Sequence, residues 1–155
     1  GELLKIMAGI DLLHVPYKGT TTALPDLLGG RVSMIFDGGA FLGHARSGKL
    51  RLLAVTSPRR LSSLPDVPTM SEAGVPGYEV VIWFGVSAPA ATPALIVERL
   101  SKEVAEIVKD PALKERFAAT GIQLVSNTPA AFVELIKRDT VKWTKLLRDA
   151  GVQQE

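Results

Sequence analysis

The chain has 155 residues, of which 46% are hydrophobic and 22% charged, so it has the apolar content of a folded domain and not of a disordered chain. The formal net charge is only +2 and the basic residues are scattered, which argues against a nucleic-acid partner. The sequence contains no cysteine, which excludes thiol catalysis, thiolate metal sites and disulfides.

Short apolar runs alternate with segments of helical periodicity along the chain. The runs predict five strands, at residues 12–16, 32–36, 50–56, 78–89 and 122–125. Helical spacing and end signals predict six helices, at 2–8, from Thr20 to Gly29-Gly30, around 40–47, at 93–108, from Asp110-Pro111 to Gly121, and at 129–149. This alternation predicts an α/β fold with a largely parallel sheet.

A proline-rich stretch separates the two halves of this pattern. Residues 57–77 carry four prolines, which disfavour regular structure apart from one helical turn near Met70–Ala73. A long ordered loop in a compact domain is usually functional or crosses between lobes. We therefore expect two lobes, joined through the apolar segment that follows.

Neither catalysis nor a cofactor is indicated by the residues. Of the two histidines, His14 lies in an apolar run, where a core or edge role is favoured over a catalytic one, and His44 is expected on the surface. Neither has a serine of the GxSxG type nearby, and the glycine pairs lack the GxGxxG spacing of a dinucleotide site. We expect no enzyme activity, no cofactor and no metal.

The segment HVPYKGTTTA at 14–23 carries the strongest local signal for binding. A strand ends, Gly19 allows a turn, and three threonines open a helix whose first amides have no partner within the helix. Such a helix start attracts anions, but the threonines are equally compatible with simple capping. Asp37, after the second strand, is likewise open between a ligand contact and a hydrogen bond that stabilises its own turn.

Four longer stretches resemble one family in the same order. They are HVPYKGTTTALPDLLGGRVSMIFD, RLLAVTSPRRLSSLPDVPTMSEAGVPGYEV, WFGVSAPAATPALIVERL and DPALKERFAATG. Together they resemble the extracytoplasmic substrate-binding receptors of tripartite tricarboxylate transporters, also called Bug receptors. The resemblance covers essentially the whole chain.

The resemblance implies a periplasmic binding protein of type II-like α/β architecture, with a ligand cleft between two lobes. Residues 1–85 would form most of the second lobe and residues 86–155 the C-terminal, helix-rich part of the first, so that the two-lobed architecture is incomplete here. It implies capture of a small carboxylate without catalysis, delivery to integral-membrane transporter subunits, and export to the periplasm. It also implies a secretion signal, which we expect to be absent from this chain.

The resemblance implies seven ligand-binding positions. The ligand loop of the family maps onto Tyr17, Gly19, Thr20, Thr21 and Thr22. Asp37 matches the family position after the second strand, and Phe84 would form a wall of the cleft. An alternative is the metabolite-sensing effector domain of a transcriptional regulator, which shares the two-lobed architecture. Because much of the first lobe would be missing, we also expect exposed apolar surface and a possible homodimer of the fragment.

Overall fold

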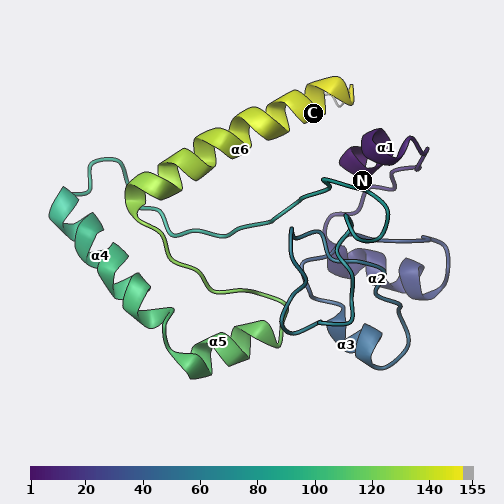
Figure 1. The fold of residues 1–155 in the computed structure, drawn as a ribbon, viewed down its shortest axis with the longest axis horizontal. Helices are drawn as coiled ribbons and strands as arrows, with labels where there is room; N and C mark the ends of the chain where they lie inside the picture. The colour runs from purple at the N-terminus through teal and green to yellow at the C-terminus, as the bar shows by residue number, and fades with distance from the viewer. Residues whose placement is uncertain (152–155) are drawn as a thin grey trace. The chain divides into compact units, whose positions relative to one another are not determined.

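The computed structural model describes residues 1–151, and its regular elements are six helices. They are α1 (Glu2–Ala8), α2 (Thr20–Leu28), α3 (Leu42–Arg46), α4 (Ala94–Ile107), α5 (Pro111–Ala118) and α6 (Pro129–Asp149) (Figure 1). All six were expected from the sequence. None of these helices combines the length and the apolarity needed to cross a bilayer.

The end signals read from the sequence hold for some helices and not for others. Gly9 ends α1 in the left-handed conformation, at φ 63°. Asp110 caps α5, accepting from the amide of Ala112 at 2.8 Å, and Thr128 caps α6, accepting from Ala131 at 3.2 Å. The pair Thr92-Pro93 likewise predicts a threonine cap for α4, but this prediction is wrong: the N-cap is Pro93, and no side chain bonds to the helix start.

The five strands expected from the sequence do not form within residues 1–151. The single β-bridge joins Val55 and Thr69, where the Val55 amide donates to Pro68 at 2.8 Å and its carbonyl accepts from Met70 at 2.9 Å. A strand needs a neighbour that pairs with it over several residues. The apolar runs lack such a neighbour, and Leu13, for example, is 91% exposed.

The chain divides into two compact units. The first contains Gly1–Ile82 together with Ala118–Ile122, and the second contains Trp83–Phe117 and the segment from Gln123 onward. The division of the fold into lobes at residue 85 stays a prediction, since these units do not by themselves identify lobes.

Among residues 1–151, the buried apolar side chains all belong to the first unit; they are Leu4, Ala23, Phe41, Leu42 and Tyr78. Its segment 118–122 packs on the turn before α3, because Gly39 has no β-carbon and lies directly against the carbonyl of Thr120. Gly39 adopts φ 112°, a conformation that other residues rarely accept. Arg46 of α3 adds a long hydrogen bond to the Ala119 carbonyl at 3.5 Å.

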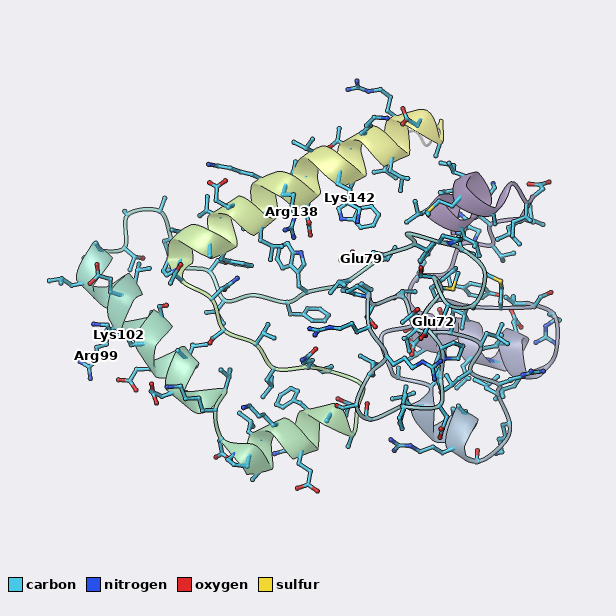
Figure 2. All side chains as sticks on the ribbon, in the orientation of Figure 1. Glu72, Glu79, Arg99, Lys102, Arg138 and Lys142 are labelled. Carbon is cyan, nitrogen blue, oxygen red and sulfur yellow. The ribbon has the colours of Figure 1, made fainter. Side chains whose placement is uncertain are left out.

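A hydrogen-bond network orders the proline-rich segment of the first unit. Glu72, labelled in Figure 2, accepts from Arg60 Nε at 2.9 Å and from the Thr69 amide at 2.7 Å, while the Thr69 hydroxyl accepts from the Glu72 amide at 3.1 Å. This reciprocal arrangement is a capping box. Ala73 then bonds back to Thr69, forming the helical turn expected near Met70–Ala73.

The second unit is built from α4, α5 and α6, and no residue of these helices is buried. Helix α4 contacts α6. Arg99 and Lys102 project from one side of α4 (Figure 2), while its apolar stripe, which includes Leu95 at 79% exposure, is uncovered as well. The expected exposed apolar surface is therefore present.

Candidate ligand site at the start of helix α2

Helix α2 begins where the sequence predicts, at Thr20, with Gly19 as its N-cap in an extended conformation at φ 169° and ψ 159°. The amides of Thr20 and Thr21 have no acceptor within residues 1–151, whereas the amide of Thr22 donates to the Gly19 carbonyl at 3.1 Å. Two free amides thus stand at the positive end of the helix dipole. The order Pro16, Gly19, Thr20–Thr22 predicts unpaired amides at Thr21 and Thr22. This is confirmed for Thr21 and wrong for Thr22, because the first turn closes on the Gly19 carbonyl.

The three threonines play different parts at this helix start. The hydroxyl of Thr22 donates to the Gly19 carbonyl at 2.7 Å, so its proton is used inside the turn. Thr20 and Thr21 are exposed, and neither caps the helix. The amides and hydroxyls of Thr20 and Thr21 are therefore free donors at the helix start.

Tyr17 is tied to the body of α2 by its hydroxyl. This hydroxyl donates to Asp26 Oδ2 at 2.6 Å, and Asp26 Oδ1 accepts from Arg31 Nε at 2.7 Å. The hydrogen bond from Tyr17, supported by Arg31, holds the pKa of Asp26 below its usual range, and the same bond raises the pKa of Tyr17. Since its proton is engaged by Asp26, Tyr17 has no proton to offer a bound carboxylate.

Asp37 stabilises its own turn. Its Oδ2 accepts from the amide of Gly39 at 2.8 Å and from the amide of Phe41 at 3.1 Å, immediately before α3. This is the turn-stabilising alternative that the sequence left open. A ligand contact through the other carboxylate oxygen stays a prediction.

Phe84 belongs to the second unit, whereas the six other candidate positions belong to the first. Its ring is 87% exposed. The neighbouring Trp83 and Gly85 both contact α6, through Asp139 and Phe132 respectively, so the alternation of an extended chain turns Phe84 to the opposite side.

The histidines do not add to this site. His14 is exposed, which excludes the core half of the expected core or edge role, and His44 contacts Phe41 edge to face at 6.4 Å between ring centroids. Across residues 1–151, no three His, Asp or Glu side chains are grouped closely enough to hold a metal ion.

The sequence gives no signal that singles out Asp26 or Arg31. Asp26 is one of several carboxylates near predicted strand ends, and Arg31 follows a glycine pair like many solvated arginines. The nine-residue spacing from Tyr17 to Asp26 is not a helical period, because the first three of those residues precede the helix. Only the folded turn brings the three side chains together.

Residues 1–152 match the family model described as "Tripartite tricarboxylate transporter family receptor", or TctC. The chain belongs to this family. The family predicted from the four sequence motifs is thereby confirmed.

Curated relatives support the membership of this TctC-family chain. It is 40% identical over 147 residues to the "UPF0065 protein in tcbD-tcbE intergenic region" of Pseudomonas sp. (strain P51), covering 94% of the present chain and 44% of that protein. It is 37% identical to "Protein BugT" of Bordetella pertussis, covering 98% and 47%. The chain thus spans about half the length of these relatives.

Solved structures show the same backbone. The TctC-family chain matches "R. palustris Rpa4515 with adipate" with a TM-score of 0.87 and 36% identity, covering 97% of this chain and 50% of that one. It matches "Structure of periplasmic binding protein BugD" with a TM-score of 0.80 and 36% identity, covering 99% and 52%. The expected fold class, part of a periplasmic binding protein, is confirmed.

Proposed function

We propose that the protein is an extracytoplasmic solute-binding receptor that captures a small carboxylate, without catalysis, for a tripartite tricarboxylate-type transporter. The observation that carries the proposal is the pair of free amides at Thr20 and Thr21, on a backbone similar to that of Rpa4515 with adipate. A second similar structure, MatC from Rhodopseudomonas palustris with bound malate, has a TM-score of 0.75 and 28% identity.

The chemistry of the helix start suits a carboxylate. Amides that lack acceptors and point along a helix axis bind anions through hydrogen bonds and through the dipole. The exposed hydroxyls of Thr20 and Thr21 supply further donors. The hydroxyls of Thr22 and Tyr17 already donate to acceptors within the protein. Phe84 and Asp37 are further proposed ligand contacts, and the proposed mechanism is closure of two lobes around the ligand.

The proposed partners are integral-membrane transporter subunits, and the proposed location is the periplasm. Both rest on membership of the receptor family and on the likeness to the periplasmic binding protein BugD. A signal peptide in the upstream coding sequence would support this location, whereas an upstream helix-turn-helix would favour a transcriptional regulator.

Binding is tested in the full-length protein, by calorimetry and thermal shift with adipate, malate and a wider carboxylate panel. A ligand well above its dissociation constant raises the melting temperature. Recovery of the ligand unchanged after long incubation would agree with a receptor, and turnover of it would point to an enzyme. No binding across the panel would refute the proposal.

The contribution of the helix start is tested by deleting one amide. Thr20→Pro removes the amide at the first helical position, where proline is tolerated, and should weaken carboxylate binding about tenfold or more. Thr20→Ala keeps the amide and serves as the control for the lost hydroxyl. Thr22→Ala should change affinity much less, since its hydroxyl serves the turn. Equal affinities for Thr20→Pro and Thr20→Ala would exclude the amide as a ligand contact.

A further inference from the structure

A negative charge lies close to the candidate anion site. Asp26 is five and six residues beyond Thr21 and Thr20 in the same helix, which corresponds to about 8 Å along the axis. Its side chain leans toward the helix start, where it accepts the Tyr17 hydroxyl at 2.6 Å. This separation is shorter than the screening length in 0.1 M salt, about 10 Å, so an uncompensated Asp26 would repel a bound carboxylate.

Arg31 supplies the compensating charge. Its Nε bonds Asp26 Oδ1 at 2.7 Å, and its Nη2 forms an ion pair with the same oxygen at 2.5 Å. The backbone holds the partners together, because the amide of Arg31 donates to the Asp26 carbonyl at 2.9 Å after the Gly29-Gly30 turn. Gly30 makes this turn at φ 71°.

We propose that Arg31 is a specificity-determining residue that acts through Asp26, cancelling its charge so that the start of α2 accepts a carboxylate. The inference rests on the proposed function. Asp26 holds Tyr17 through a hydrogen bond, and this bond brings a charge that the binding segment must neutralise. Arg31 itself lies beyond the far end of the helix and need not touch the ligand.

The test uses the full-length protein with adipate as the probe, at low and high ionic strength. Arg31→Gln leaves Asp26 uncompensated and should raise the dissociation constant about threefold to tenfold at low salt. The loss should shrink at high salt, because added ions screen the repulsion. Arg59→Gln removes an exposed charge from the same unit and serves as the matched control, with little change expected.

A double variant separates charge compensation from a structural role. Asp26→Asn keeps an acceptor for the Tyr17 hydroxyl but removes the charge, so Asp26→Asn combined with Arg31→Gln should restore affinity to within about twofold of wild type. A purely structural ion pair would leave the double variant at least as weak as Arg31→Gln. That outcome, or an unchanged affinity for Arg31→Gln with wild type binding normally, overturns the inference alone. A wild-type protein that binds no carboxylate overturns the proposed function as well.

Discussion

Gly85 and the ring of Phe132 lie in direct contact, so close that a β-carbon at residue 85 would overlap the ring atoms. The same ring meets Trp83 edge to face, with 5.2 Å between ring centroids. Phe132 of α6 therefore packs against Trp83 and Gly85, the two sequence neighbours of Phe84. This contact fixes the course of the extended chain along the second unit.

We expect Gly85→Ala to destabilise the protein by about 1 to 3 kcal/mol, because the added carbon must displace the Phe132 ring. Urea unfolding measures the change. Gly43→Ala is the control, since a β-carbon there meets open space in α3. Combining Gly85→Ala with Phe132→Leu should recover part of the loss, and no recovery would argue against this contact as the cause.

The indole of Trp83 anchors the same segment by a polar bond, since its Nε1 donates to Asp139 Oδ2 at 2.7 Å. Asp139→Ala should cost about 1.5 kcal/mol, a typical value for a hydrogen bond to a charged group. Asp149→Ala breaks only the exposed ion pair with Lys145 and should change stability by less than about 0.5 kcal/mol. Equal effects of the two substitutions would contradict the anchoring role of Trp83.

Two similar threonine-proline pairs should respond differently to alanine. Thr128 accepts from the Ala131 amide at the start of α6, so Thr128→Ala should cost about 1 kcal/mol of stability. Thr92 makes no cap bond to α4, and Thr92→Ala should have less than half of that effect. Denaturant midpoints of the two variants measure the difference directly.

Acid should weaken the proline-rich segment. The hydrogen bond from Arg60, and then the one from the Thr69 amide, lowers the pKa of Glu72. A lowered pKa in the folded state contributes stability above the usual carboxyl value of about 4.3, and this stability is lost as the pH falls through the folded pKa. Glu72→Gln should therefore flatten the decline of the urea midpoint between about pH 5 and pH 3. Glu115→Gln on α5 removes a carboxylate elsewhere in the chain and serves as the matched control.

Alkali should reveal the bond between Tyr17 and Asp26. That bond raises the pKa of Tyr17, so its contribution to stability is present below about pH 10 and is lost as the pH rises through the folded pKa. In a Tyr78→Phe background Tyr17 is the remaining tyrosine, and its ionisation is followed by ultraviolet absorbance. Asp26→Asn should lower the pKa of Tyr17 toward its ordinary value, and an unchanged titration would show that the bond is not formed in solution.

The sequence by itself determined the helices and the family. Helix ends depend on local chemistry, such as the cap at Thr128 and the left-handed Gly9, which a short window of residues already contains. The start of α2 at Thr20 was predictable for the same reason. The ordered motifs carried the family resemblance that the family model then confirmed.

Only the tertiary structure decided which apolar runs pair and which donors stay free. Pairing of a strand depends on a neighbour distant in sequence. Within residues 1–151 the expected strands form only the bridge at Val55 and Thr69 and one backbone hydrogen bond from Val80 to Thr56 at 2.9 Å. In the same way, the clamp of Tyr17 on Asp26 and the compensation by Arg31 depend on how two turns fold around α2. Contacts between side chains on different turns follow no helical or strand periodicity, so the sequence does not predict them. The charge balance of the candidate site is therefore known only from the three-dimensional structure.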